Sequence, residues 1–450
     1  MVDAAHVKDV RLTADENETI TRVGPGTPMG ELMRRYWQPV LSSSELPEPD
    51  CAPVRVRILG EDLVAFRDTS GRIGLLTEFC AHRRTSLWLG RNEEDGLRCV
   101  FHGWKYDITG QCVDMPNVLP EYDFKERVTV RAYPTQELGG VIWAYMGWGV
   151  AKGKQPPPPN FEWTRQPESH LHVSRSLQEC NWLQALEAGV DSIHTSFLHR
   201  RFSGNRAGLA GIRAQATAAR LEVRLAPYGY AYASSRPMSE GKGDYVRTYH
   251  YVMPFHQIRA IQGETEDSAV RKFKIAGHMW VPVDDHNCMV WNWYYSLDLP
   301  LDDDERDEGF WGNGPRFVDA QNGFRSFLNK GNDWGIDREV QKHETFSGIE
   351  GVNQQDRAVQ EAMGPIVDRS HEHLSHTDMA VFAARRLLLD AIKTVADGGA
   401  PPGADESYYD IRAIEKLLPT DADWMEELKD QMYPKGGPDL ASAPALGRQE

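Results

Sequence analysis

The chain has 450 residues, of which 40% are hydrophobic and 26% charged, as expected for a soluble globular protein with one to three domains. Its formal net charge of −16 argues against nucleic acid or an anionic membrane as the main partner, because both attract basic surfaces. No apolar run approaches the ~20 residues that span a bilayer, and the N-terminus lacks a signal-peptide pattern, so we expect a cytoplasmic protein without a membrane span.

The residue pattern in the first third of the chain predicts an N-terminal segment followed by a small all-β domain. Residues 1–40 form the N-terminal segment and contain a short helix, with Thr27 as its N-cap and Pro28 as its first residue. Residues 41–151 show alternating strand patterns separated by turns, as in the run 54–59, which a Gly-Glu-Asp turn follows.

A proline-rich linker over residues 152–160 marks the domain boundary, because consecutive prolines cannot continue a sheet or a helix interior. The larger domain over residues 161–435 mixes helices and strands, and residues 436–450 form a loose tail. The elements expected in the larger domain are helices over 181–199 and 377–396 and strands over 245–253, 272–281 and 289–297.

Two pairs of potential metal ligands lie in the small β domain, Cys80-x-His82 and Cys99-x-x-His102. Two thiolates can hold one ferric ion of a two-iron, two-sulfur cluster while two imidazoles hold the other, which removes negative charge and raises the reduction potential. Zinc is an alternative, although its ligands usually come as a Cys pair followed by a His pair. Buried residues without a metal are the third interpretation.

A second group of polar residues, Asp191, His194 and His199, lies in the segment expected to be helical. Asp191 and His194 are three residues apart and would share one helix face, whereas His199 would lie ~140° further round. For both imidazoles to bind one metal, the helix must therefore break, and Thr195 and Ser196 are the expected place. Two histidines and a carboxylate with open positions suit oxygen-activating ferrous iron. Hydrogen-bonded residues near a helix end are the alternative.

With both groups present, the sequence resembles the Rieske non-haem iron ring-hydroxylating oxygenases, and most of all the oxygenase (alpha) component of the branch typified by phthalate dioxygenase. The resemblance covers nearly the whole chain and includes residues 17–40 and 353–386. It implies an α+β protein, with an N-terminal all-β Rieske [2Fe-2S] domain and a catalytic domain of antiparallel sheet flanked by helices.

The resemblance also implies which residues hold the metals. The third ligand of the catalytic iron is a carboxylate late in the catalytic domain, which we place at Asp356, with Glu361, Asp368 and Asp378 as alternatives. The implied [2Fe-2S] ligands are Cys80, His82, Cys99 and His102, and the implied Fe2+ ligands are His194, His199 and Asp356.

The resemblance implies a separate role for Asp191. It would connect His194 at the iron with His102 at the cluster of a neighbouring subunit, so that electrons pass between the two centres. This bridge in turn implies a homo-oligomer, a trimer or two stacked trimers. Two positions depart from the family pattern: Ala81 stands where Pro is common, and Arg84 where Gly is common. Neither position supplies a ligand.

The implied activity is that of a terminal oxygenase, which uses O2 and electrons relayed from NAD(P)H by a separate flavin and iron–sulfur reductase. The implied reaction is dihydroxylation of an aromatic carboxylate, phthalate-like or phenoxybenzoate-like. Arg206 and Arg247 are candidate ligands for the carboxylate, because a guanidinium binds it bidentately; surface or salt-bridged arginines are the alternative. O-demethylation of a methoxylated aromatic acid is a second candidate reaction. A Rieske electron carrier without oxygen chemistry is the alternative from another class.

Overall fold

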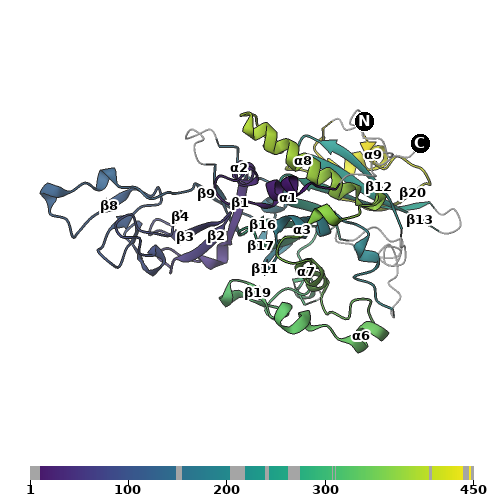
Figure 1. Ribbon diagram of the computed structural model, residues 1–450, viewed down its shortest axis with the longest axis horizontal. Helices are drawn as coiled ribbons and strands as arrows, with labels where there is room; N and C mark the ends of the chain where they lie inside the picture. The colour runs from purple at the N-terminus through teal and green to yellow at the C-terminus, as the bar shows by residue number, and fades with distance from the viewer. Residues whose placement is uncertain are drawn as a thin grey trace. The chain divides into compact units, whose positions relative to one another are not determined.

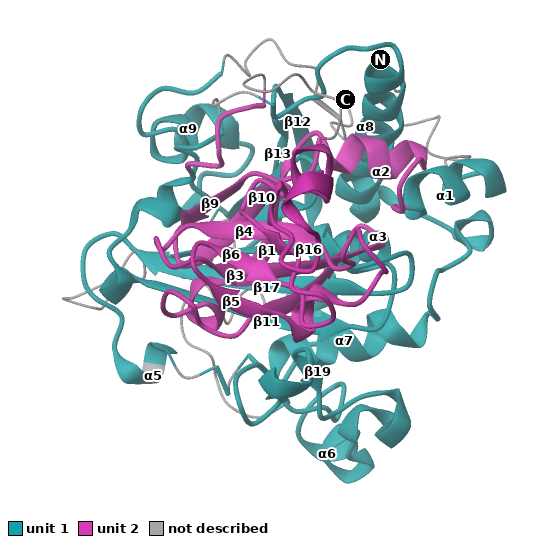
Figure 2. Ribbon diagram, turned by 90° about the vertical axis from the view of Figure 1, so that its left-hand side faces the viewer, with its two compact units in different colours: residues 1–22, 161–450 teal, residues 23–160 magenta. Residues whose placement is uncertain are grey.

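The computed structural model consists of two compact units, which Figure 2 shows in different colours. Unit 1 comprises residues 1–22 and 161–450, and unit 2 comprises residues 23–160. Helix α1 (Ala14–Thr21) thus belongs to the larger unit, whereas the sequence grouped it with α2 (Pro28–Met33) in one segment. The structure describes residues 11–147, 155–202, 218–238, 243–261, 274–306, 308–309, 311–404, 408–438 and 445–446.

Unit 2 is built from three small antiparallel sheets, with strand orders β1-β10-β9, β2-β3-β4 and β5-β6-β7-β8. Helix α2 begins where the sequence predicted, because the Thr27 hydroxyl accepts a hydrogen bond from the Gly30 N–H at 3.1 Å and Pro28 follows it. The strands are β1 (Trp37–Ser42), β2 (Val54–Ile58), β3 (Glu61–Arg67), β4 (Ile73–Thr77), β5 (Arg91–Glu93), β6 (Gly96–Arg98), β7 (Lys105–Tyr106), β8 (Cys112–Asp114), β9 (Thr135–Leu138) and β10 (Val141–Tyr145).

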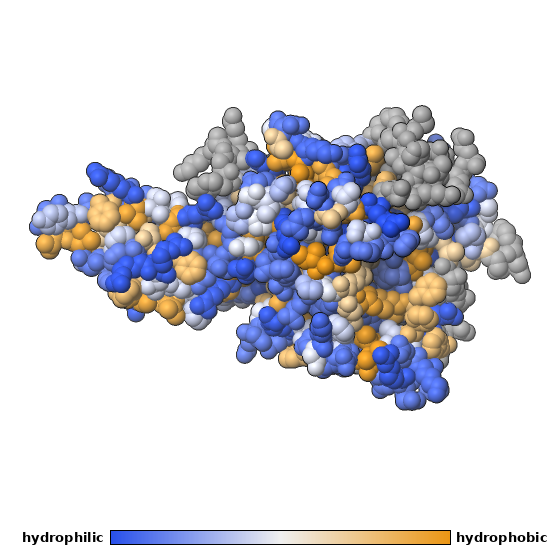
Figure 3. Space-filling model, viewed as in Figure 1, coloured by the Kyte–Doolittle hydropathy of each residue, from blue (hydrophilic) through white to orange (hydrophobic). Residues whose placement is uncertain are grey.

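The core of unit 2 includes two of the predicted ligands, Cys80 and Cys99, packed with Trp104 and Tyr106. Aliphatic and aromatic side chains from β3, β4, β6 and β7 belong to the same cluster. The surface of the same unit is partly apolar. Figure 3 shows apolar patches on the end that carries β8, and Leu119, which comes after this strand in the chain, is one of the exposed apolar residues. Such patches on a folded surface often mark contact sites for other molecules.

Unit 1 is organised around one large sheet, which has eleven strands within the described residues. Its main order is β18-β19-β11-β17-β16-β15-β14-β13-β12-β21, and β20 pairs with β14. In the stretch of this order that begins at β11 and ends at β12, every pair of neighbouring strands is antiparallel. The predicted strands correspond to β14, β16 and β17. The strands are β11 (Leu171–Gln178), β12 (Arg220–Ala226), β13 (Gly229–Pro237), β14 (Asp244–Val252), β15 (His256–Ala260), β16 (Lys274–Pro282), β17 (Cys288–Ser296), β18 (Val318–Asp319), β19 (Arg325–Ser326), β20 (Glu415–Leu418) and β21 (Ala445–Leu446).

Helices pack against this sheet, as Figure 1 shows for α3 (Trp182–Val190) and α8 (Met379–Ala396). Helix α3 packs on β16 and on α7 (Val352–Ala362), whereas α8 packs on β12 and β13. The close approach of α3 to β16 requires Gly189, because a Cβ there would lie 2.0 Å from the Trp280 ring. Four further helices are α5 (Asp303–Arg306), α6 (Arg338–His343), α9 (Trp424–Met432) and α1. In the part of the chain that is described, no helix has both the length and the apolar character needed to cross a membrane.

A buried ionic network fastens α3 to its neighbours. Glu187 on α3 accepts hydrogen bonds from Arg369 Nε at 2.9 Å and from Arg385 Nε, on α8, at 2.6 Å. Arg385 also pairs with Glu372 at 2.7 Å, and Arg369 donates to Asn17 on α1 at 2.9 Å. Burial opposes ionisation of Glu187, but the two arginines hold its pKa below the ordinary value. The network therefore stabilises the helix from which the metal-site residues follow.

Candidate metal centres and substrate cavity

One face of the unit 1 sheet carries a polar row that lines a cavity of about 1140 Å³, open solvent included. Residues directly opposite each other in an antiparallel pair share a face. The register places Tyr249 opposite Arg259, Gln257 opposite His278, and His278 opposite Asn292. Because Gln257 and Arg259 are two residues apart on β15, all five side chains point to the same side. The sheet therefore presents a floor of hydrogen-bonding groups to the cavity.

Above this floor, the chain turns sharply at the end of α3. Asn181 caps the start of the helix, and Asp191 ends it by adopting an extended conformation, with φ −66° and ψ 128°. The Asp191 carboxylate then accepts hydrogen bonds from the N–H groups of Ile193 at 2.7 Å and His194 at 3.1 Å. The helix therefore ends at Val190, earlier than the break predicted at Thr195 and Ser196, because Asp191 takes over the N–H groups that would have continued it.

This turn brings His194 and His199 to Asp356 on α7, three residues that the sequence separates widely. Asp356 Oδ1 lies 3.6 Å from His194 Nε2 and 3.3 Å from His199 Nε2. One ligand atom from each residue lies within 4.8 Å of the others, and the residues line the cavity. The two imidazole rings are nearly perpendicular, at 82°. Such a three-sided set leaves further coordination positions toward the cavity.

A neighbouring hydrogen bond selects the metal-binding form of His199, and a carboxylate lies close to the corresponding atom of His194. Gln355 donates its amide to the Ile349 carbonyl at 2.7 Å, so its Oε1 faces His199 Nδ1, also at 2.7 Å. Asp191 Oδ2 lies 3.5 Å from His194 Nδ1. With its Nδ1 proton held by Gln355, His199 keeps the Nε2 lone pair for a metal. The donor set, two neutral imidazoles and one carboxylate, fits ferrous iron.

The charge of Asp356 agrees with this arrangement. Burial would raise the pKa of Asp356, but His199 and His194 lower it well below its ordinary range. Burial would lower the pKa of His194, but the nearby carboxylates of Asp191 and Asp356 raise it. A carboxylate ionised at neutral pH between two imidazoles can receive a divalent cation without first losing a proton.

The other three candidate carboxylates have different partners. Glu361 accepts from Trp334 Nε1 at 2.6 Å, Asp368 accepts from the Ser370 N–H at 3.0 Å, and Asp378 accepts from the Ser375 N–H at 2.7 Å. Asp368 and Asp378 act in local turn and capping interactions rather than near the histidines. Among these candidates, all within the described ranges, the structure brings Asp356 to the two histidines.

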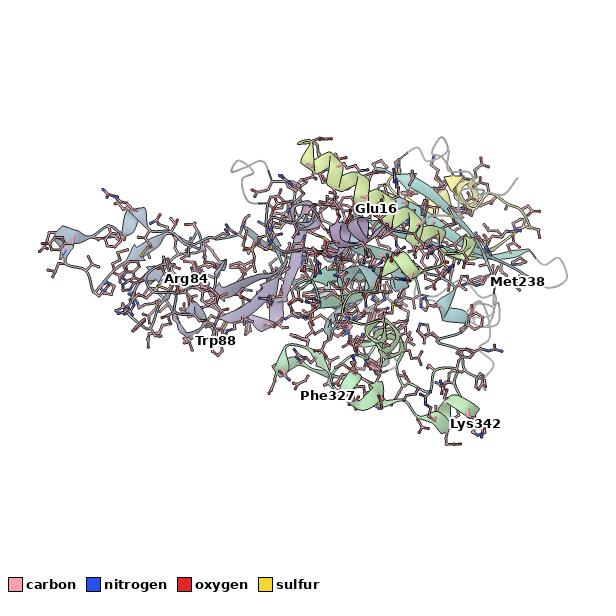
Figure 4. The ribbon with its side chains drawn as sticks, viewed as in Figure 1. Glu16, Arg84, Trp88, Met238, Phe327 and Lys342 are labelled. Atoms are coloured by element: carbon pink, nitrogen blue, oxygen red, sulfur yellow. The ribbon has the colours of Figure 1, made fainter. Side chains whose placement is uncertain are left out.

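In unit 2, the two Cys–His segments form loops of the same construction. Arg84 N–H donates to the Cys80 carbonyl at 3.0 Å, and Gly103 N–H donates to the Cys99 carbonyl at 2.9 Å. Arg84 and Gly103 both have positive φ, at 61° and 80°. This conformation favours Gly, which explains why the family commonly has Gly at the position of Arg84. Figure 4 labels Arg84 and Trp88 in this part of unit 2.

The two loops bring the four predicted cluster ligands together around a small hollow. Cys80 and Cys99 are buried, while the rings of His82 and His102 lie 4.4 Å apart. Both Nδ1 atoms are buried and have no hydrogen-bond partner among the described residues. Trp104 stacks on His82 with ring centres 4.5 Å apart and shields the hollow. Buried unpaired nitrogens beside two thiols fit the ligand set of a Rieske [2Fe-2S] cluster.

The two arginines expected to bind a carboxylate have different outcomes. Arg206 lies outside the described residues. Arg247 lines the cavity, but its guanidinium already lies 3.4 Å from Glu415 and donates to the Ala260 carbonyl. Arg247 therefore lines the cavity, as predicted, and is also salt-bridged, which was the alternative considered from the sequence. Two further arginines that line the cavity, Arg259 and Arg357, were missed, although the alternation of Arg259 with Gln257 could have indicated one face of a strand.

Comparisons with known proteins agree with this architecture. Residues 36–134 match the Rieske [2Fe-2S] domain, and residues 144–437 match the LigXa C-terminal domain like family. The chain is 38% identical to the 3-chlorobenzoate-3,4-dioxygenase oxygenase subunit of Comamonas testosteroni, over 92% of this chain and 96% of that protein. It is 36% identical to the phthalate 4,5-dioxygenase oxygenase subunit of Pseudomonas putida, over 92% and 94%.

Solved structures show the same fold at lower sequence identity. Pseudomonas putida CBB5 NdmA with caffeine superposes with a TM-score of 0.59 at 18% identity, covering 88% of this chain and 100% of that one. Dicamba monooxygenase bound to dicamba superposes with a TM-score of 0.56 at 17% identity, over 81% and 98%. The fold and the paired metal-ligand sets define a Rieske-type oxygenase. This chain belongs to that family as an oxygenase subunit, and it is an oxidoreductase with a Rieske [2Fe-2S] domain.

Proposed function

We propose that this protein is the terminal oxygenase of a system that dihydroxylates an aromatic carboxylate, with O2 and with electrons relayed from NAD(P)H by a separate reductase. The observation that carries the proposal is the convergence of His194, His199 and Asp356 beside a cavity that Arg247 also lines. The ligand set suits Fe2+, which when bound supplies the centre for oxygen activation. An arginine in the wall suits a carboxylate.

The residues of the chain prepare this centre in three ways. Gln355 and Asp191 orient the two imidazoles, as their contacts with the Nδ1 atoms show. Trp280 and Tyr249 form an aromatic part of the cavity wall, which favours an aromatic ring over water as the occupant of the cavity. Arg247 and, in the segment outside the described residues, Arg206 would bind the carboxylate. A substrate held in this way would present one ring edge to the triad.

Electrons would reach this centre through Asp191 from His102 of the partner subunit. The cysteines of the cluster site are buried, whereas His82 and His102 are partly exposed, so the imidazole side is open to another protein surface. Phe101, beside His102, is 51% exposed and offers apolar contact area there. We infer a trimer or two stacked trimers, which would bring each cluster to the Asp191 of a neighbour.

O-demethylation of a methoxylated aromatic acid is the second candidate. It is favoured by 32% identity, over 91% of this chain, to the 5,5'-dehydrodivanillate O-demethylase oxygenase subunit of Sphingobium sp. (strain NBRC 103272 / SYK-6), which matches over 86% of its length. The same three metal ligands serve either reaction, so the shape of the cavity decides which bond is attacked. The two candidates differ in their products rather than in their iron site.

The test is turnover of a substrate panel by the purified oxygenase with a surrogate reductase, NADH and 18O2. Phthalates and phenoxybenzoates should gain two labelled oxygen atoms, detected by product mass. Methoxybenzoates that release formaldehyde would instead favour O-demethylation. Turnover confined to uncharged aromatic compounds would overturn the carboxylate assignment. Replacing Arg247 by Ala should raise KM for the acid while iron content is retained, and an unchanged KM would remove Arg247 from substrate binding.

A further inference from the structure

Side chains from three strands of the unit 1 sheet converge on the short segment that joins α3 to the metal-site turn. They are Arg236 on β13, Tyr249 on β14 and Gln257 on β15. Tyr249 is opposite Tyr232, which lies four residues before Arg236 on its strand. Tyr249 is also opposite Arg259, which lies two residues after Gln257. Because side chains alternate along a strand, the three converging side chains lie on the same face of the sheet.

Ser192 is the residue that two of these side chains hold. Arg236 Nη2 donates to the Ser192 carbonyl at 2.9 Å and to its hydroxyl at 3.3 Å. The same Ser192 hydroxyl is hydrogen-bonded to the Tyr249 hydroxyl at 3.0 Å. The Thr195 hydroxyl donates to the Ser192 carbonyl at 3.0 Å, so this carbonyl joins the sheet to the residue that follows His194. Ser192 and Arg236 are 1% and 0% exposed, so water does not compete for these contacts.

The third side chain holds the end of α3 itself. The last carbonyl groups of a helix have no partner within the helix. Gln257 Nε2 supplies one, because it donates to the Gly189 carbonyl at 2.6 Å. The same amide donates to the Tyr232 hydroxyl at 2.6 Å, and the Tyr232 ring stacks on Tyr249 with ring centres 4.6 Å apart. The groups on the sheet therefore also hold one another in place.

Asp191 lies between the two residues that are held, Gly189 and Ser192, and His194 follows two residues later. The Asp191 carboxylate accepts hydrogen bonds from the N–H groups of Ile193 and His194. A shift of Ser192 would therefore move the carboxylate and the imidazole together. Metal ligands must be held within about 0.5 Å of their working geometry by the groups behind them, so such a shift would weaken metal binding.

We propose that Arg236, Tyr249 and Gln257 form a clamp of positioning residues, which sets where Asp191 and His194 stand relative to the other two predicted metal ligands. The clamp acts through its hydrogen bonds to Ser192 and Gly189. The inference rests on the proposed function only in taking His194 as a ligand of ferrous iron. The identity of the substrate does not enter it.

The test is the affinity of the purified full-length protein for ferrous iron, measured without oxygen by competition with a chelator. Tyr249→Phe and Ser192→Ala remove opposite ends of the same hydroxyl contact, so each should weaken iron binding roughly three- to tenfold. The double variant should bind iron within about twofold of the weaker single variant, because both changes remove one interaction. Arg236→Met removes the contact with the Ser192 carbonyl, which Ser192→Ala leaves in place, so these two changes together should weaken binding more than either alone.

The matched control is Tyr251→Phe, which lies on the same strand as Tyr249. It also removes a buried hydroxyl hydrogen bond, from Tyr251 to the Pro254 carbonyl at 2.7 Å, but away from the clamp. Its iron affinity should stay within about twofold of the wild type. A second readout is the electron paramagnetic resonance spectrum of the nitric oxide complex of ferrous iron, recorded at saturating iron with the cluster oxidised. The two hydroxyl variants, Tyr249→Phe and Ser192→Ala, should change its rhombic splitting, and the control should not.

The outcomes separate the clamp from the proposed function. Wild-type iron affinity in both hydroxyl variants would overturn the clamp while the proposed function stands, and so would a loss of affinity that leaves the spectrum unchanged. An equal loss in Tyr251→Phe would overturn it as well, because any lost buried hydrogen bond would then act alike. Weaker iron binding and a changed spectrum in the hydroxyl variants of a protein that oxidises no aromatic acid would support the clamp and contradict the proposed function. Each hydroxyl variant removes a single oxygen atom, so the test stands even if Arg236→Met fails to fold.

Discussion

Replacing Glu187 by Gln removes the anion that two buried arginines share. Arg369 Nε donates to Glu187 at 3.0 and 2.9 Å, and Arg385 Nε donates at 2.6 Å. The two arginine side chains are 0% and 3% exposed, so the variant leaves buried charge without its counter-ion. Breaking a buried ion pair in this way costs about 3–5 kcal/mol. Because Arg385 keeps Glu372 at 2.7 Å, we expect the lower value, about 3 kcal/mol.

The loss should appear first as local opening of α3, which the network fastens to α8 and α1. A change of about 3 kcal/mol corresponds to roughly 100-fold faster exchange of α3 amide hydrogens, measured by mass spectrometry of deuterated peptides. Peptides of unit 2 should be unchanged and serve as an internal reference. Iron should also be retained less well, because His194 follows this helix.

The matched control is Asp390→Asn on α8, whose carboxylate is 51% exposed and lies 3.3 Å from Arg386. An exposed pair of this kind contributes less than about 1 kcal/mol, so its loss should hardly affect exchange. If α3 exchange in Glu187→Gln stayed within about threefold of this control, the buried network would not be what holds α3, and the reasoning would fail.

Three further predictions concern the two metal sites. Gln355→Leu should lower the affinity for iron roughly 10- to 100-fold, measured by competition with a chelator, because it removes the partner of His199 Nδ1; unchanged affinity would exclude that role. Asp191→Asn should leave iron and cluster content intact but slow reoxidation of the reduced cluster in stopped-flow absorbance, and equal rates in variant and wild type would reject the electron bridge. Arg84→Gly should stabilise unit 2 by about 1 kcal/mol, because Gly adopts the φ of 61° without strain. Urea unfolding followed by cluster absorbance measures this, and Arg83→Gly, at a position without positive φ, should give no such gain.

The cluster site was predictable from the sequence because its geometry is local. Each Cys–His pair lies within one loop, and each loop closes on itself through hydrogen bonds to its own cysteine carbonyl. Short spacing therefore sets which side chains can meet within each loop. The α2 start at Thr27 and Pro28 was predictable for the same reason, since capping involves neighbours within one turn.

The periodicity of apolar residues predicted the ends of helices and the short strands less well, where another interaction competed with the local pattern. The helical pattern over residues 181–199 was correct for α3 but not beyond it, because the Asp191 carboxylate captures the next N–H groups. The strand β15 was missed as well, although it places Gln257 and Arg259 in the cavity wall. Its five residues form too short a pattern for alternation to be distinctive.

What the sequence by itself determined is the pair of motifs, since each consists of ligands a few residues apart, together with the division into a β domain and a mixed domain. Only the tertiary structure decided that Asp356, rather than Glu361, Asp368 or Asp378, joins His194 and His199. The physical reason is that packing of α7 against α3, and strand register within one sheet, join residues whose separation along the chain carries no information about distance.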